Sequence, residues 1–320
     1  MDKSMIDPKI LDQIERLRQK YDVMGQDLSS YLDGLLYANY LNYWDYIHLD
    51  TLLSLQNPKT DFPDENIFII YHQMTELNFK LVLLEIDQIA NKPQIKEEFF
   101  VVRLQRVNRY FQMLTNSFDI MVDGMDRDQF LKFRMSLLPS SGFQSAQYRM
   151  IEICATDFKN LVSKEFRDEL SPATPVEEMY KNIYWKQGAT ELATGKKTLT
   201  LKKFEEKYSK ELIELAAKYR GCNLWAIYKN HFIHSERKAE IIKELRKFDI
   251  LVNVNWPLSH FKSAVKYLQK DPEVISATGG TNWQKYLPPR FQFRIFYPEL
   301  WSKEELENWG KRFVDMEELS

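Results

Sequence analysis

Glycine is scarce in this chain, with only 10 glycines among 320 residues. Barrels and nucleotide-binding α/β folds depend on glycine at turns and phosphate loops, so this composition disfavours both. The sequence also contains no phosphate-binding loop, dinucleotide fingerprint, nucleophile elbow or HExxH zinc motif. None of the common short catalytic motifs therefore points to a function.

Cysteine, net charge and long apolar runs are equally limited. The two cysteines, Cys154 and Cys222, fit neither a disulfide framework nor a metal-ligand spacing. A net charge of −2 offers no electrostatic basis for binding nucleic acid or an anionic membrane. No stretch approaches the roughly 18 apolar residues of a membrane-spanning helix, and the charged N-terminus lacks a signal-peptide core. We expect a cytoplasmic protein that binds neither nucleic acid nor membrane.

Helical periodicity dominates what is present. Apolar residues spaced by three and four predict helices at 64–89, 97–122, 204–218, 225–248 and 256–268. No repeat and no flexible linker divides the chain. We therefore predict an all-α fold with a single domain over residues 1–320, in which 1–35 form an N-terminal helical segment and 172–203 an irregular insertion.

Aromatic residues make up 14% of the chain, whereas only five residues are histidine. His72 lies within the apolar segment IFIIYHQMTELNFK, and in a helix it shares one face with Phe68 and Glu76. Spacing alone favours a core histidine that bonds a backbone carbonyl or Glu76. The alternative is a histidine in the wall of a pocket, with Phe68 one turn away to contact a flat apolar ligand.

A second histidine, His260, follows Trp256 by one turn on an amphipathic helix. A single helical histidine that faces a cavity is a common way to hold haem iron, and no other pattern in the sequence is typical of a metal site. His231 and His234 are three residues apart but have no cysteine or carboxylate partner at a zinc-like spacing. We interpret that pair as structural or surface residues.

Two further features are compatible with a ligand pocket. Arg134 stands one turn after Phe130 on an otherwise apolar short helix. It is either a surface arginine packed on aromatic rings or a guanidinium fork for a ligand carboxylate. Thr278 and the glycines that follow it form either an ordinary turn or a loop that brings a hydroxyl and backbone groups over a pocket.

Several segments, taken in order, resemble the tryptophan 2,3-dioxygenase family. The resemblance spans most of the chain from Tyr43 to Trp301, and its most specific stretch is SGFQSxQYRxIE. The matching segments are YWDYIHLDTLL (43–53), DENIFIIYHQMTELNFKLVLLEID (64–87), FLKFR (130–134), SSGFQSAQYRMIE (140–152), NWPLSH (255–260), ATGGTNWQKYL (277–287) and FYPELW (296–301).

This resemblance implies an all-α domain of the tryptophan/indoleamine dioxygenase type that binds haem b. His260 matches the axial ligand of the haem iron, with Trp256 and Gly279 beside the cofactor. A homotetramer built as a dimer of dimers is also implied, in which the N-terminal segment packs on a neighbouring subunit. Tyr43 and Tyr46 match tyrosines that reach the neighbour's pocket.

The resemblance also implies a substrate and a reaction. The expected partners are L-tryptophan and O2, and the expected reaction opens the indole C2–C3 bond to give N-formyl-L-kynurenine, in the kynurenine pathway of tryptophan degradation. His72 matches the catalytic histidine that contacts the indole N–H, and Arg134 matches the arginine that pairs with the substrate carboxylate. The remaining substrate contacts are Phe68, Phe130, Leu137 and Thr278.

The chain departs from the family pattern at four places. It has Pro63 in an HDE motif, Asn78 in an ELW motif, Pro257 where an arginine commonly follows the tryptophan, and Trp283 in a loop that usually reads TGGSSG. Two alternatives therefore accompany the dioxygenase hypothesis. One is a haem mono-oxygenase that acts on a modified tryptophan or on tyrosine, and the other is a haem-binding protein without catalysis.

Overall fold

A computed structural model describes most of the chain, and its contacts divide the chain into two compact units, Met1–Asn57 and Pro58–Ser320. The described residues are 6–38, 41–137, 140, 142–171, 173–190, 196–270, 273–274 and 287–311. The sequence suggested an N-terminal segment of 1–35 within one domain over 1–320. Both remain predictions, and the boundary drawn by the contacts lies further along the chain, at Asn57.

The first unit consists of helices whose apolar side chains stay exposed. Asp7 caps the first helix by accepting a hydrogen bond from the Lys9 N–H at 2.8 Å, and no residue of that helix is buried. Its apolar stripe, Ile10, Leu11, Ile14 and Leu17, faces solvent. The helices are α1 (Pro8–Val23), α2 (Leu28–Leu36), α3 (Tyr43–Tyr46) and α4 (Leu49–Leu53).

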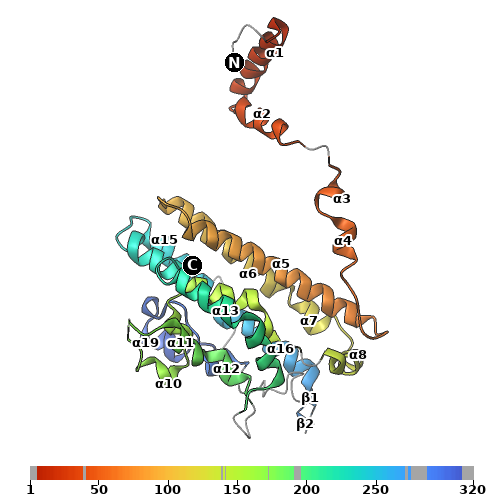
Figure 1. Ribbon diagram of the computed structural model, residues 1–320, viewed down its shortest axis with the longest axis vertical. Helices are drawn as coiled ribbons and strands as arrows, with labels where there is room; N and C mark the ends of the chain where they lie inside the picture. The colour runs from red at the N-terminus through yellow and green to blue at the C-terminus, as the bar shows by residue number, and fades with distance from the viewer. Residues whose placement is uncertain are drawn as a thin grey trace. The chain divides into compact units, whose positions relative to one another are not determined.

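Long helices form the body of the second unit (Figure 1). The helix α5 packs along α6 and α9, while α6 also contacts α15 and α9 also contacts α13. The all-α prediction is confirmed. The long helices, with α9 among them, are α5 (Asp64–Ala90), α6 (Glu97–Ser117), α9 (Ala146–Ala155), α13 (Leu199–Tyr219), α15 (Lys238–Ile250) and α16 (Trp256–Leu268).

Shorter elements connect these helices. A single two-stranded hairpin pairs β1 (Gln269–Lys270) with β2 (Glu273–Val274) within the described residues. The predicted insertion at 172–203 contains two short helices in its described part. The short helices are α7 (Asp119–Asp123), α8 (Arg127–Phe133), η2 (Arg134–Leu137), η3 (Gly142–Gln144), η4 (Phe158–Leu161), α10 (Lys164–Arg167), α11 (Val176–Lys181), α12 (Tyr184–Gly188), α14 (Leu224–Ile227), α18 (Pro289–Gln292), η7 (Pro298–Leu300) and α19 (Lys303–Glu307).

Two turns of π-helix interrupt the regular pattern. The turn η5 (Tyr228–Phe232) follows α14, and residues 233–237 are not helical, so the prediction of one helix over 225–248 is wrong there. The turn η6 (Leu251–Asn255) instead joins α15 to α16 without a break. The helix that carries His260 is therefore longer than its apolar pattern predicted.

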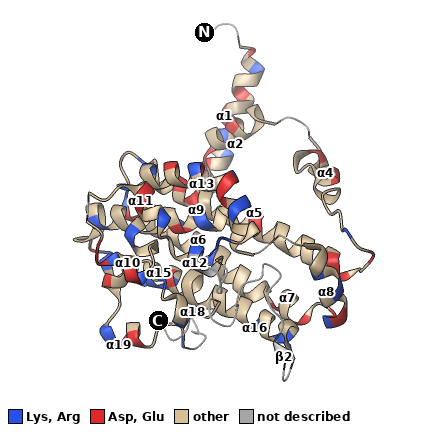
Figure 2. Ribbon diagram, turned by 60° about the horizontal axis from the view of Figure 1, so that its bottom comes forward, with Lys and Arg blue, Asp and Glu red and all other residues tan. Residues whose placement is uncertain are grey.

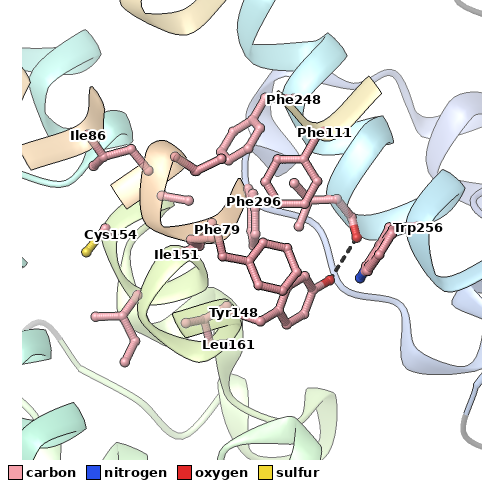
Figure 3. Packing of buried hydrophobic residues seen from close by; sticks show 14 of the residues in the cluster. Phe79, Ile86, Phe111, Tyr148, Ile151, Cys154, Leu161, Phe248, Trp256 and Phe296 are labelled. Atoms are coloured by element: carbon pink, nitrogen blue, oxygen red, sulfur yellow. Dashed lines mark hydrogen bonds between the residues drawn. The ribbon is translucent and has the colours of Figure 1, made fainter. Parts of the chain in front are cut away.

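Aromatic rings fill the core between these helices (Figure 3). The Phe79 ring of α5 lies 5.8 Å from that of Phe111, 5.4 Å from that of Tyr148 and 6.0 Å from that of Trp256, measured between centroids. Because Trp256 begins the helix of His260, this cluster ties α5 to α16. Outside the core, Lys and Arg alternate with Asp and Glu along the helices (Figure 2).

Candidate functional site

His260 projects from α16 one turn after Trp256. Its Nδ1 lies 2.9 Å from the Trp256 carbonyl oxygen. A carbonyl only accepts hydrogen bonds, so Nδ1 carries the proton and Nε2 keeps its lone pair. Burial lowers the pKa of His260 to about 4. The imidazole is therefore neutral near pH 7 and has a free donor nitrogen, which is the form that binds metal ions.

Aromatic rings surround the His260 imidazole. The ring centroid of Phe118 lies 4.4 Å away and that of Trp256 lies 4.6 Å away. Phe118 in turn contacts Tyr71, at 5.7 Å between centroids, and Tyr71 directly precedes His72 in α5. The imidazole itself is half-buried. Aromatic contacts thus connect the helices of His260 and His72.

His72 has the same tautomer as His260. Its Nδ1 donates to the Phe68 carbonyl oxygen at 2.7 Å, which leaves Nε2 as an acceptor. Desolvation lowers the pKa of His72, although its side chain remains exposed to solvent. The His72 imidazole is therefore partly desolvated by neighbouring protein atoms and still reachable by solvent. His72 also contributes to lowering the pKa of His260, behind the larger effect of burial, so the two imidazoles are within electrostatic reach.

The structure bears on one of the two interpretations of His72 from the sequence. The bond to a backbone carbonyl is present, as expected for a core histidine, but the side chain is exposed. The pocket alternative stays a prediction. The Oε2 of Glu76 accepts a hydrogen bond from the Gln147 Nε2 at 2.8 Å, which orients this carboxylate towards α9.

The predicted apolar wall comes together beside His72. The Phe68 ring lies 4.1 Å from the His72 ring and 5.9 Å from the Phe133 ring, while Phe133 lies 5.5 Å from Phe130. Arg134 follows Phe133 at the start of η2 and is only 5% exposed, and Leu137 ends that turn half-buried. Burial lowers the pKa of the Arg134 guanidinium. Phe68, Phe130 and Phe133 therefore form one aromatic region beside His72, and the buried Arg134 directly follows Phe133 in the chain.

Other predicted site residues are not tested by this geometry. Thr278 and Gly279 lie outside the described residues. Tyr43 and Tyr46 belong to the first unit, where their side chains are 70% and 75% exposed. The Trp256 ring contacts the His260 ring, and its place beside the cofactor stays a prediction.

Three aromatic residues of the region were not predicted from the sequence as site residues. Phe118 contacts His260, Tyr71 links the two histidine-bearing helices, and Phe133 joins Phe68 to Phe130. Each is buried and looks like ordinary core in the sequence. The available signal was their position beside a predicted site residue or at a helix end.

Asn78, a departure from the family pattern, is accounted for locally. It is buried on the inner face of α5, and its Nδ2 donates to the Met74 carbonyl oxygen at 2.8 Å. The amide is therefore paired within its own helix.

Comparison with known proteins decides the family. A family model described as tryptophan 2,3-dioxygenase matches residues 37–243, which is more than half of the chain. The chain belongs to the tryptophan 2,3-dioxygenase family. His72 and Arg134 lie inside the matched range, whereas His260 lies beyond it.

Individual relatives carry the same name. A tryptophan 2,3-dioxygenase from Ruegeria sp. (strain TM1040) is 43% identical over 119 residues, which cover 36% of this chain and 42% of that protein. One from Ruegeria pomeroyi is 28% identical over 271 residues, which cover 83% of this chain and 92% of that protein. One from Bacillus cereus is 40% identical over 113 residues, which cover 35% of this chain and 40% of that protein. The higher identities thus span less than half of the relatives' length. No helix in the described part of the chain has the length and apolar character needed to cross a membrane.

The residues around His260 fit the haem that the dioxygenase family uses. A haem iron needs only one protein nitrogen, because the porphyrin supplies four others. His260 offers a neutral imidazole with Nε2 free, flanked by the flat rings of Phe118 and Trp256. Among the described residues, no group of three or more His, Cys, Asp or Glu side chains could hold a metal ion. His260 thus offers one donor nitrogen, Nε2.

Proposed function

We propose that this protein is a haem-dependent tryptophan 2,3-dioxygenase, which converts L-tryptophan and O2 to N-formyl-L-kynurenine. Membership of the family supports a dioxygenase reaction. The observation that carries the proposal is the pair of neutral imidazoles, His260 and His72, each with Nδ1 bonded to a carbonyl and Nε2 free. One imidazole suits an iron and the other suits an N–H donor of a substrate.

His260 would hold the iron of haem b through Nε2, and the Trp256 carbonyl fixes the orientation of its ring. Bound haem supplies the binding and activation of O2. Trp256 and Phe118 exclude water from this side of the site because both are buried. Gly279 is proposed from the resemblance alone as a further residue beside the cofactor.

On the substrate side, His72 would accept the indole N–H through Nε2, with Phe68 against the indole ring. Arg134 would pair with the substrate carboxylate, because its planar guanidinium matches the geometry of a carboxylate. The hydrogen bond and the ion pair together place the indole in one orientation, which is the main contribution a protein makes to cofactor chemistry. The remaining substrate contacts proposed from the resemblance are Phe130, Leu137 and Thr278.

We also propose the homotetramer of the family, a dimer of dimers in which Tyr43 and Tyr46 reach a neighbouring pocket. Apolar side chains exposed in both units support association. The outer face of α5 exposes its apolar residues at 41% to 54%, and the apolar stripe of α1 is exposed as well. Such patches are typical of protein interfaces. The exposed residues of α5 are Ile70, Leu77, Leu81 and Leu84.

The test of the proposed site is haem retention. His260→Ala removes the axial ligand, so we expect the purified variant to lose nearly all of the haem that the wild-type protein binds after reconstitution. His231→Ala is the matched control, because His231 is an exposed histidine in another helical segment. Haem content and the spectrum of the reduced protein are measured with and without L-tryptophan. Equal haem content in wild type and His260→Ala would refute this ligand.

A further inference from the structure

The helix that carries His260 contains a proline in an unusual place. Pro257 stands in the first turn of α16, directly after the π-helical turn η6. The helix formed by α15, η6 and α16 continues through this proline. Proline has no N–H and its ring collides with the carbonyl four residues earlier, so it normally ends or kinks a helix. A π turn contains an extra residue and is common at functional sites. Here it allows α15 and α16 to remain one helix.

The π turn leaves one carbonyl without its usual helical donor. The Trp256 N–H, which an α-helix would direct at the Val252 oxygen, donates to the Leu251 oxygen instead. The donor that a π-helix would direct at Val252 belongs to Pro257, which has no N–H. A buried carbonyl without a donor is unfavourable, because it has lost its hydrogen bonds to water. Val252 is fully buried, so it needs a donor from outside the helix.

Two side chains from distant segments supply that donor. The Tyr148 hydroxyl of α9 donates to the Val252 oxygen at 3.0 Å, as the dashed line at Tyr148 in Figure 3 shows. The Nη2 of Arg294 donates to the same oxygen at 3.1 Å and to the Tyr148 oxygen at 2.7 Å. The carbonyl that Pro257 exposes is therefore capped twice.

Buried charges hold these two side chains in place. Glu152 accepts hydrogen bonds from Arg294 and, at 2.8 Å, from Arg149, while the Tyr184 hydroxyl donates to it at 2.6 Å. Both arginines and the glutamate are at most 7% exposed. Tyr148, Arg149 and Glu152 belong to SGFQSxQYRxIE, the most specific segment of the resemblance. In the structure, this segment therefore caps the Val252 carbonyl and binds Arg294, next to the helix that carries His260.

A residue of the π turn itself takes part in this network. The side-chain oxygen of Asn253 accepts from Arg294, and its Nδ2 donates to Asp249 at 2.6 Å. Asp249 in turn accepts from the backbone N–H of Phe296 at 2.9 Å. Hydrogen bonds through Asn253 and Asp249 thus connect the π turn to Arg294 and Phe296 of the C-terminal segment.

The register of η6 determines where His260 points. Successive residues of an α-helix are rotated by about 100°, so removing the extra residue of a π turn would rotate everything after it by about that angle. Trp256, whose N–H closes the π turn, also holds the His260 imidazole through its carbonyl at 2.9 Å. A rotation of this size would move the imidazole out of the site.

We propose that Tyr148 and Arg294 are positioning residues for His260, because they cap the Val252 carbonyl and so hold the π turn that Pro257 opens. The iron-binding role of His260 rests on the proposed function. The capping of the π turn rests only on the hydrogen bonds to the Val252 oxygen. The haem-free protein therefore tests the turn, and the haem-loaded protein tests its consequence for the ligand.

Tyr148→Phe removes one cap and keeps the ring. In the haem-free protein we expect amide exchange in residues 251–260 to become about tenfold faster and the carbon-13 ring signal of His260 to shift. Tyr180→Phe is the matched control, since it removes another buried hydroxyl, which contacts Ser209 at 3.2 Å. In the haem-loaded ferrous protein, Tyr148→Phe should shift the iron–histidine stretching frequency, whereas Tyr180→Phe should not.

Pro257→Ala supplies the backbone N–H that the wild-type chain lacks. Combined with Tyr148→Phe, it should return amide exchange and the His260 signal towards the wild-type values, because the new N–H replaces the lost cap. The proposal is overturned if Tyr148→Phe matches Tyr180→Phe in the haem-free protein, or if Pro257→Ala gives no rescue. If the wild-type protein binds no haem, the proposed function fails, while exchange and rescue still decide the capped turn.

Discussion

At the scale of single residues, hydrogen bonds to carbonyls determine what the two histidines can do. Each imidazole donates through Nδ1 to a carbonyl of its own helix one turn earlier, so neither can be protonated at Nε2 without becoming charged. Burial opposes that charge and lowers both pKa values. The resemblance pointed to both histidines, whereas spacing alone favoured a core role for His72. Neither could reveal the tautomers, because these depend on rotamers and on burial by remote segments.

Arg134→Lys should weaken substrate binding while leaving haem content unchanged. Lysine keeps the positive charge but loses the planar fork that matches a carboxylate. A charge-assisted hydrogen bond is worth about 1.5–3 kcal/mol, so we expect KM for L-tryptophan to rise about 10- to 100-fold. Lys132→Ala, which removes an exposed cation two residues away, is the control. Unchanged KM in Arg134→Lys would separate this residue from the substrate carboxylate.

Asp249 should make stability depend on pH. Its carboxylate is fully buried, which raises its pKa to about 6 against the hydrogen bonds from Phe296, Tyr297 and Trp301. The folded protein therefore binds this proton more tightly than the unfolded chain does. The free energy of unfolding should fall by about 3 kcal/mol from this group as pH rises from about 4 to about 6.

Asp249→Asn removes that titration. Urea unfolding of the haem-free wild-type and variant proteins between pH 4 and 7 measures it, and the wild-type protein should lose stability relative to the variant as pH rises. Parallel pH profiles would contradict the raised pKa.

At the scale of elements, the sequence predicted helices with clear ends and missed changes within them. Asp64 and Glu65 after Pro63 marked the start of α5, and the predicted span 64–89 is one residue shorter than the observed helix. The span 256–268 matches α16. The π turn before Pro257 was not predictable from the sequence. The Val252 carbonyl in this turn accepts hydrogen bonds from Tyr148 and Arg294, which lie far away in the chain. Phe118 and Phe133 look like ordinary core in the sequence, and only the folded chain shows their contacts with His260 and Phe68.

Phe79→Ala should show that α5 and α16 share one core. The Phe79 ring contacts Phe111, Tyr148 and Trp256, and the side chain is 2% exposed. Truncation leaves a cavity, so we expect a loss of about 3–5 kcal/mol in the free energy of unfolding. Leu77→Ala on the exposed face of the same helix should change it by less than about 0.5 kcal/mol in the monomer. Equal losses in both variants would contradict this packing.

At the scale of the whole molecule, the family match and the proposed haem site come from different parts of the chain. The matched range of the family model holds His72 and Arg134, whereas the proposed iron ligand lies after it on α16. The packing of Phe79 on Trp256 and of Phe118 on His260 joins these parts in one unit. The tetramer remains a proposal, supported by apolar residues that both units expose.

The most direct test of the central claim is the isotopic composition of the product. The haem-loaded, anaerobically reduced protein is mixed with L-tryptophan and oxygen-18 gas, and the product is analysed by mass spectrometry. We predict N-formyl-L-kynurenine that carries both labelled oxygen atoms, with no product from the His260→Ala variant. A product with a single labelled atom would indicate the mono-oxygenase alternative, and the absence of turnover by fully haem-loaded protein would indicate a non-catalytic haem protein. Either result would contradict the account.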